Sequence, residues 1–236
     1  RILWDKTRGG SSPLPRTNYK KMNKTIAIIN DPNVTLGTLP STIIMQNAWE
    51  ADWSKFNHND NYIILGGHMG AYEEEKYEYL KKEKEWIRNA VENNSKILGI
   101  CLGSQLVADS LDGEAYLSDE IEFGFKKLNF ISKDEKFSDF EDSVVFTWHR
   151  DTFKIPSEAQ LIAHTDFPQI YTIKNTVCIQ FHPEVTVELF DKWYDSEISK
   201  KELKNYDVEL TRNKLINHEK LMYQKVNSFY KKWLDS

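Results

Sequence analysis

The segment Lys96–Gln105 (Lys-Ile-Leu-Gly-Ile-Cys-Leu-Gly-Ser-Gln) constrains the fold more than any other part of this sequence. An apolar run that is typical of a buried strand ends at Cys101, and a helix-like segment begins directly after it. A chain that turns so abruptly holds its apex residue at a strained backbone angle and tolerates little bulk beside it. Gly99 and Gly103 remove that bulk. The segment therefore predicts a sharp strand–helix turn with Cys101 at its apex.

Cys101 is the candidate nucleophile. In the serine version of this turn, Gly-x-Ser-x-Gly, the reactive side chain stands above the sheet, and the N–H of the next residue faces the developing oxyanion. Here the next residue is Leu102. A helix that begins there also directs its positive dipole end at the sulfur, which favours the thiolate. The alternative is a small buried apolar residue, which is how we interpret Cys178.

A candidate base lies further along the chain, where the apolar run Thr176–Phe181 leads into His182-Pro183-Glu184. Residues two apart in an extended segment point to the same side, so Glu184 can bond one ring nitrogen of His182 while the other faces a thiol. Such a carboxylate fixes the imidazole tautomer and supports its positive charge after proton transfer. These residues are typical of base-assisted nucleophilic catalysis.

Taken together and in this order, Gly-Ile-Cys-Leu-Gly-x-Gln and Phe-His-Pro-Glu-Val resemble the motifs of class I glutamine amidotransferases. The resemblance implies a catalytic triad of Cys101, His182 and Glu184. It implies that Cys101 attacks the side-chain amide of glutamine, that a γ-glutamyl thioester forms as ammonia leaves, and that water then releases glutamate.

Two further segments agree with this family. Tyr62–Tyr72 matches the strand and glycine-rich turn beside the nucleophile, and the resemblance implies that a backbone N–H near Gly67 completes the oxyanion hole with that of Leu102. Val144–Phe153 resembles the Trp-His-Gly-Asp-Thr-Phe element of stand-alone amidotransferase-like proteins related to the glutaminase part of GMP synthase. The match departs from the pattern at His68, where a proline is usual.

The second of these segments also bears on substrate binding. In the family this region helps to hold the α-amino and α-carboxylate groups of the substrate, so the resemblance implies that His149, Arg150 and Asp151 contact it, together with Gln105. Arg150 stands where the relatives carry glycine. A cation there can reach a substrate carboxylate or pair with a nearby acidic residue, which leaves the γ-glutamyl donor open.

Three alternatives stay open. A γ-glutamyl hydrolase shares the turn, the histidine and the thioester chemistry but cleaves a γ-linked peptide or conjugate. His149, Asp151 and His182 are two histidines and one carboxylate, the donor set of an iron-binding facial triad, although this interpretation leaves the Cys101 turn unexplained. A non-catalytic regulatory subunit keeps the fold without turnover.

We expect glutamine or another γ-glutamyl compound as the substrate and no cofactor or metal. The sequence has no phosphate-gripping Gly-x-x-x-x-Gly-Lys-Ser/Thr loop and, at 236 residues, no room for an acceptor domain, so a synthase would be a separate chain. The net charge of −5 and the lack of a basic stripe argue against nucleic acid as a partner.

The length and the 40% hydrophobic content suit one α/β domain. We expect residues 1–21, which are polar and rich in turn residues, to be a tag-like or disordered leader, and residues 22–236 to form one domain. No apolar stretch approaches the roughly 20 residues of a membrane helix, and the first residues lack a signal-peptide block. We therefore expect a cytoplasmic enzyme without membrane contact.

Short aliphatic runs alternate with helical segments, which predicts a parallel sheet flanked by helices. The resemblance implies a flavodoxin-like three-layer sandwich of the amidotransferase type. Only a short helix or strand near Thr42–Trp49 is expected within Asp31–Asp60. We predict helices over Glu73–Asn93, from Leu102, and from about Thr186. Strands are expected at Thr25–Ile29, Tyr62–Leu65, Lys96–Ile100, Glu122–Phe130, Val144–Trp148, Gln160–His164, Ile170–Lys174 and Val177–Phe181.

Overall fold

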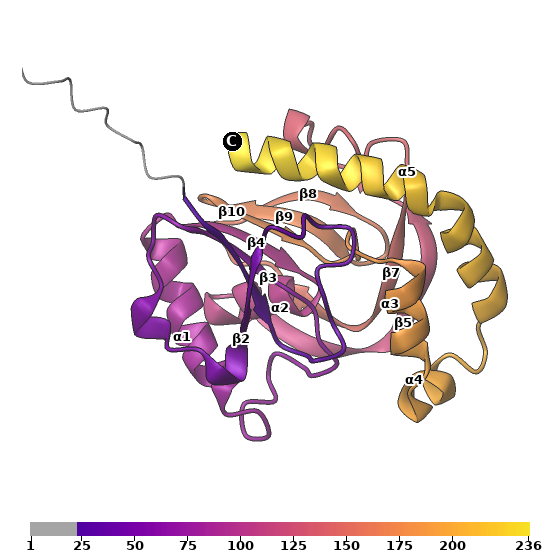
Figure 1. The fold of residues 1–236 in the computed structure, drawn as a ribbon, viewed down its shortest axis with the longest axis horizontal. Coiled ribbons are helices and arrows are strands. Elements are labelled where there is room, and N and C mark those ends of the chain that lie inside the picture. The colour runs from indigo at the N-terminus through magenta and orange to yellow at the C-terminus, as the bar shows by residue number, and fades with distance from the viewer. Residues whose placement is uncertain (1–22) are drawn as a thin grey trace, which may run out of the picture.

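The computed structural model describes residues 23–236, so the predicted leader lies outside the described residues. At the centre is an eight-stranded sheet with the order β2-β1-β3-β4-β10-β9-β8-β6 (Figure 1). The strands from β2 to β10 run parallel, and β9, β8 and β6 extend the sheet antiparallel, which confirms a mostly parallel sheet. The strands of this sheet are β1 (Thr25–Ile29), β2 (Ile44–Asn47), β3 (Asn61–Ile64), β4 (Lys96–Ile100), β6 (Asn129–Phe130), β8 (Gln160–His164), β9 (Pro168–Ile173) and β10 (Thr176–Ile179).

Helices cover both faces of this sheet. Ile28 of β1 joins the apolar cluster under α1 and α2, whereas Ala27 and Ile29 join the cluster under α5. Because successive side chains of a strand point to opposite faces, both faces of β1 are buried. The result is the expected three-layer sandwich, with α5 crossing one side in Figure 1. The helices are α1 (Tyr79–Glu92), α2 (Leu102–Ser110), α3 (Val187–Tyr194), α4 (Glu197–Glu202) and α5 (Val208–Asp235), with short 3-10 helices η1 (Ala48–Glu50), η2 (Trp53–Lys55) and η3 (Glu135–Phe137).

The predicted start of the first long helix is wrong. Helix α1 begins at Tyr79 and not at Glu73, because the residues before it form turns. The Glu73 side chain accepts a hydrogen bond from the N–H of Gly70 (2.9 Å), which fixes a turn within the predicted helix. Leu80, Ile87 and Val91 on one face of α1 are buried against the sheet.

A second correction concerns the two middle strands. They lie mainly in a separate antiparallel ribbon of β5 (Glu114–Lys127) and β7 (Val144–Lys154). Strand β5 begins before the predicted Glu122 and β7 extends past the predicted Trp148, whereas Asn129–Phe130 of the first predicted strand belongs to β6 of the main sheet. After a shift in register between Leu117 and Glu122, the pairing resumes between Glu114–Leu117 and Asp151–Lys154. Within Glu114–Ile121 only Ala115 is buried, so this part of β5 carries little apolar signal, whereas the end of β7 buries Thr152 and Phe153.

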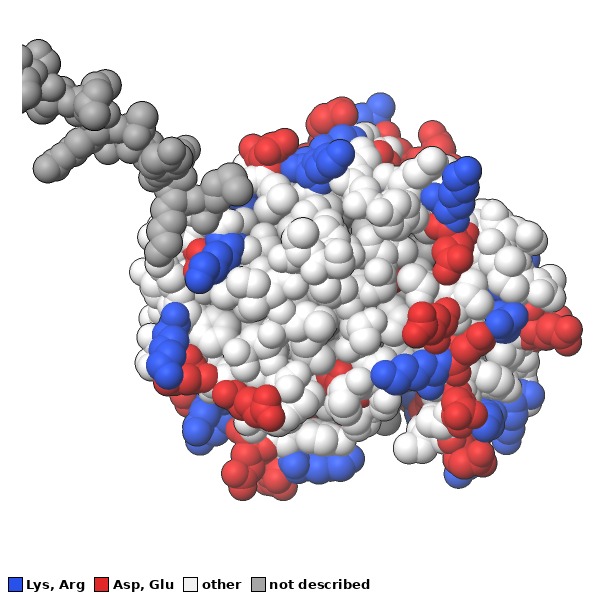
Figure 2. Space-filling view, viewed as in Figure 1, with Lys and Arg blue, Asp and Glu red and all other residues white. Residues whose placement is uncertain are grey.

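Residues 31–60 contain β2, η1 and η2 and no longer helix, which agrees with the short element expected near Thr42–Trp49. No helix within residues 23–236 combines the length and the apolarity that a membrane span needs. Lys and Arg alternate with Asp and Glu around the rim of the face in Figure 2, and the centre of that face is largely uncharged.

Candidate active site

Cys101 lies at the sharp turn between β4 and α2, as predicted. Its φ of 51° and ψ of −110° are rare for a residue other than glycine. A side-chain carbon on Gly103 would lie 2.0 Å from the Ile64 carbonyl oxygen, and one on Gly99 would lie 2.8 Å from the Gly103 backbone. The helix therefore packs directly on β3 and β4. The N–H of Cys101 donates to the Ile179 carbonyl (2.8 Å), which ties the apex to β10.

His182 and Glu184 follow β10 and form a buried pair. The Nδ1 of His182 lies 2.8 Å from Oε1 of Glu184, and Glu184 has no solvent exposure. The other ring nitrogen, Nε2, lies 3.3 Å from the Trp148 carbonyl oxygen. The Trp193 ring packs against the imidazole, with the ring centroids 4.9 Å apart. Hydrogen bonds and an aromatic wall thus hold the imidazole in one orientation.

The segment that carries this pair is held by a loop that gave no clear signal in the sequence. Thr38 donates its N–H to the Glu184 carbonyl (2.9 Å) and its hydroxyl to the Pro183 carbonyl (3.1 Å). The turn residues 31–43 therefore support the site from a distant part of the chain.

The imidazole and the sulfur come together on one side of the sheet. A side-chain carbon on Gly66 would lie 3.5 Å from both Cβ of Cys101 and Cε1 of His182, so this glycine marks where the two residues meet. Burial alone would lower the pKa of His182, but the negative charges of Cys101 and Glu184, and hydrogen bonds to both side chains, raise that pKa well above its usual value. Such a site favours the protonated, positively charged imidazole.

Gly67 lies against the side chain of Leu102, since a side-chain carbon on Gly67 would lie 2.9 Å from Cδ2 of Leu102. The N–H of Leu102 is the first of α2, a position that has no acceptor within its own helix. His68 follows, and its Nδ1 lies 2.5 Å from Oδ2 of the buried Asp31. Burial opposes ionisation of Asp31, but the hydrogen bond with His68 lowers the pKa of Asp31. The glycine-rich turn is thus anchored by an ion pair.

Gln105 is buried on α2, and its Nε2 donates to the Asp151 carbonyl (3.1 Å) and to Oε1 of Gln180 (3.2 Å). Gln180, which was not predicted as a site residue, is fully buried and places Nε2 3.6 Å from the Cys101 sulfur. Its position two residues before His182, on the same side of an extended segment, is the signal that could have found it.

His149 lies behind this layer. Its Nε2 lies 2.9 Å from Oε2 of Glu122, and its Nδ1 lies 3.1 Å from the Asp151 carbonyl. Both nitrogens are therefore occupied by protein groups. The Asp151 carboxylate accepts a hydrogen bond from the Tyr72 hydroxyl (3.3 Å), and burial raises the pKa of Asp151. Arg150 is exposed beside it.

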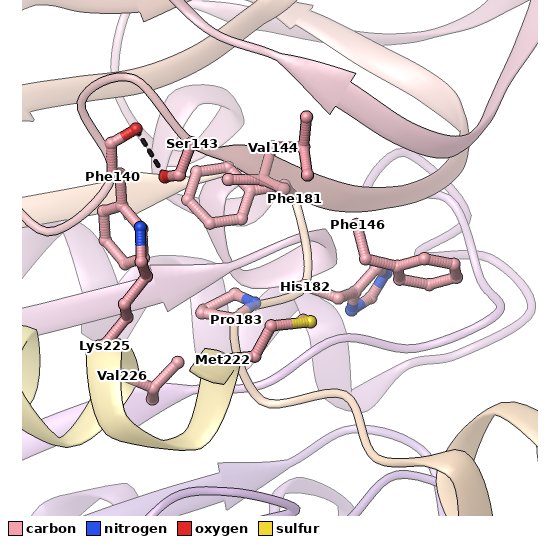
Figure 3. A pocket seen from close by; sticks show the side chains of 11 residues that line it. Phe140, Ser143, Val144, Phe146, Phe181, His182, Pro183, Met222, Lys225 and Val226 are labelled. Carbon is pink, nitrogen blue, oxygen red and sulfur yellow. Dashed lines mark hydrogen bonds between the residues drawn. The ribbon is translucent and has the colours of Figure 1, made fainter. Parts of the chain in front are cut away.

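A small cavity lies beside His182, between β7 and α5 (Figure 3). It is lined by Val144–Phe146, by Phe181–Pro183 and by residues of α5, and the Cys101 sulfur does not line it. Within residues 23–236, no three or more His, Cys, Asp and Glu side chains are arranged to hold a metal ion. His149 faces the carboxylate of Glu122, and His182 faces that of Glu184. The facial-triad alternative therefore gains no support.

The fold and the site define an α/β protein in which a cysteine at a strand–helix turn meets a buried histidine–glutamate pair. Residues 28–198 match the class I glutamine amidotransferase family, and the chain belongs to this family. The mostly parallel sheet with helices on both faces agrees with the flavodoxin-like sandwich that the resemblance implied.

Curated relatives and a solved structure are consistent with this family. The chain is 33% identical over 163 residues to one subunit of a glutamine-hydrolysing GMP synthase from Picrophilus torridus, covering 66% of this chain and 80% of that one. It is 33% identical over 129 residues to a glutamine-hydrolysing GMP synthase from Brachyspira hyodysenteriae, with 52% of this chain matched to only 24% of that protein. A glutamine amidotransferase structure from Thermotoga maritima superposes with a TM-score of 0.78 at 27% identity, covering 91% of this chain and 99% of that one.

Proposed function

We propose that this protein hydrolyses the side-chain amide of glutamine through a γ-glutamyl thioester on Cys101 and releases ammonia for a separate acceptor. The observation that carries the proposal is the meeting of Cys101 and His182, from distant parts of the chain, with Glu184 bonded behind the imidazole at 2.8 Å. This is the arrangement that nucleophilic catalysis by cysteine needs.

The proposed first half-reaction begins with the thiolate of Cys101. It attacks the side-chain carbonyl carbon of glutamine, a C–S bond forms, and the N–H groups of Leu102 and Gly67 stabilise the oxyanion. The imidazolium of His182 donates its proton to the leaving nitrogen as the C–N bond breaks. Ammonia departs, and the γ-glutamyl group stays on the sulfur as a thioester.

In the second half-reaction neutral His182 takes a proton from water, which attacks the thioester carbonyl. The C–S bond breaks, glutamate leaves, and the thiolate–imidazolium pair is restored. Glu184 keeps Nδ1 protonated and supports the positive charge in both halves. In the proposed pose, Arg150 meets the substrate α-carboxylate and Asp151 its α-amino group, while Gln105 and His149 shape the pocket.

The acceptor of the ammonia is proposed to be a synthase on another polypeptide. The Picrophilus torridus relative is named as one subunit of its synthase, and this chain covers 80% of it, which supports the presence of a partner chain. A cytoplasmic location and the division into a leader and one domain stay predictions.

The two cysteines give a matched test. We expect Cys101→Ala to reduce ammonia release from glutamine by about 10³-fold or more, because it removes the nucleophile. Cys178→Ala should stay within about twofold, because Cys178 is buried under α1 and α2 and burial raises its pKa to about 12. Steady-state ammonia release from glutamine measures both. Equal loss in the two variants would contradict the assignment of Cys101.

The choice of substrate separates the proposal from its alternatives. Glutamine and a γ-glutamyl peptide are offered in parallel, and ammonia, free glutamate and the released peptide are measured. Cleavage of the peptide with no ammonia from glutamine would replace the proposal with a γ-glutamyl hydrolase. If a glutamine-mimicking alkylator labels Cys101 but neither substrate is turned over, with or without the partner chain, the protein is a regulatory subunit.

A further inference from the structure

Gln180 is a buried polar side chain that faces the nucleophile and takes no part in the steps above. It follows β10 directly and has no solvent exposure. Its backbone N–H donates to the Gln169 carbonyl (2.8 Å), which continues the pairing of β10 with β9 beyond the last strand residue. This pairing sets which way the Gln180 side chain points. Its Nε2 lies 3.6 Å from the sulfur of Cys101.

The hydrogen bonds behind Gln180 fix which end of its amide meets the sulfur. The carbonyl oxygen of Asp151 can only accept, so Gln105 must present Nε2 to it (3.1 Å). The same Nε2 donates to Oε1 of Gln180 (3.2 Å). With Oε1 occupied in this way, Gln180 turns its N–H donors toward Cys101. A backbone carbonyl of β7 thus determines the polarity of the whole chain of hydrogen bonds.

We infer that Gln180 is a positioning residue that donates a hydrogen bond to the thiolate of Cys101 and holds the sulfur in place for attack. The inference rests on the proposed function. An N–H that points at an anion stabilises it, and a buried donor with a fixed orientation loses little freedom when it does so. The sulfur is then held by Gln180 and by the imidazole of His182. As the C–S bond forms, charge leaves the sulfur and the Gln180 contact weakens.

The titratable groups around the sulfur fall into three sets, and each set is held by its own contacts. His182 faces it with Glu184 bonded behind, and the Asp31–His68 pair lies behind Gly67. The third group is Asp151 with His149, behind Gln105. The Gln180 amide is neutral, so its contribution is separable from theirs by substitution.

The rate of iodoacetamide alkylation of Cys101 as a function of pH tests the inference, because alkylation reports the thiolate and requires no turnover. Peptide mass spectrometry resolves Cys101 from Cys178. We expect Gln180→Leu to raise the midpoint of the profile by about one pH unit, because the anion loses a donor. Gln180→Glu should raise it further, because a carboxylate then faces the sulfur. The exposed Gln160→Leu, which makes the same chemical change far from the site, should leave it within about 0.2 units.

Equal midpoints in the wild-type protein and both Gln180 variants would overturn the inference, since a purely structural role changes the melting temperature and not the profile. If the Gln180 variants do not fold, Gln105→Met carries the test. It removes the donor that orients Gln180 and should shift the midpoint upward by a smaller amount, and an unchanged midpoint there would also overturn the inference. Ammonia release is measured separately. A shifted midpoint without ammonia release from glutamine would support the Gln180 contact and contradict the proposed function. Ammonia release with an unshifted midpoint would support the proposed function and contradict the Gln180 contact.

Discussion

At the residue scale, the site depends on the buried carboxylate of Glu184, which has few hydrogen-bond partners. Glu184 bonds the imidazole through Oε1, while its Oε2 has no hydrogen-bond partner within residues 23–236. A buried carboxylate with so little other support is strongly coupled to the charge of His182. The pair therefore behaves as one unit, and a change at Glu184 is felt at the nitrogen that faces Cys101.

This coupling gives a prediction for Glu184→Gln. The amide keeps the shape but not the charge, so the pKa of His182 should fall and kcat for ammonia release should drop by about 10²–10⁴-fold, with a smaller change in KM. Steady-state kinetics over a range of pH measure both effects. The exposed Glu188→Gln serves as the control and should behave as wild type. A Glu184→Gln enzyme within threefold of wild type would show that the carboxylate plays no part.

At the element scale, α1 is attached to the sheet by a contact that its sequence hides. Glu83 lies in a run of Lys and Glu that predicts a solvated helix face, yet it has no solvent exposure. Asn30, just after β1, donates Nδ2 to its Oε1 (3.1 Å), and burial raises the pKa of Glu83 to about 8. Oε2 of Glu83 and Oδ1 of Asn30 have no hydrogen-bond partner within residues 23–236.

The raised pKa predicts how stability depends on pH. The folded protein binds a proton at Glu83 that the unfolded chain releases above about pH 4.5, so the free energy of unfolding should fall as pH rises from there toward about 8. Glu83→Gln should remove this slope and be more stable than wild type at about pH 8.5, by about 1–2 kcal/mol. Urea unfolding at several pH values measures the difference. The exposed Glu85→Gln is the matched control, and parallel pH curves for wild type and Glu83→Gln would refute the assignment.

At the scale of the whole molecule, α5 closes the layer opposite α1 and α2. Trp233 near its end is 1% exposed in the same apolar cluster as Phe229. Lys96, at the start of β4, donates Nζ to the carbonyls of Trp233 (2.8 Å) and Leu234 (3.1 Å). The end of the chain is thereby attached to the strand that leads to Cys101, at the opposite end of that strand from the sulfur.

Trp233→Ala should therefore lower stability without changing the chemistry. We expect a loss of about 3–5 kcal/mol in the free energy of unfolding, since a large buried ring leaves a cavity. The indole N–H has no partner within residues 23–236, so Trp233→Phe should cost far less, about 1 kcal/mol. Urea unfolding and kcat per folded molecule check both variants. Similar losses in the two would mean that the ring is not packed as described.

The sequence by itself determined the parts of the protein that depend on neighbouring residues. The glycines around Cys101 require a tight strand–helix turn, the spacing of His182 and Glu184 places them on one side of an extended segment, and apolar periodicity marks β1, β4 and β8 with their observed bounds. These features depend on local backbone geometry, which adjacent residues encode directly.

Only the tertiary structure decided which buried polar groups meet. The contact of Gln180 with Cys101, the support of Glu184 by Thr38, the burial of Glu83 and the pairing of Glu114–Leu117 with the end of β7 all join residues that are far apart in the chain or look solvent-exposed in sequence. A buried polar side chain must find a partner, but its own sequence neighbourhood does not say which one. That choice is made when the sheet and its helices pack together.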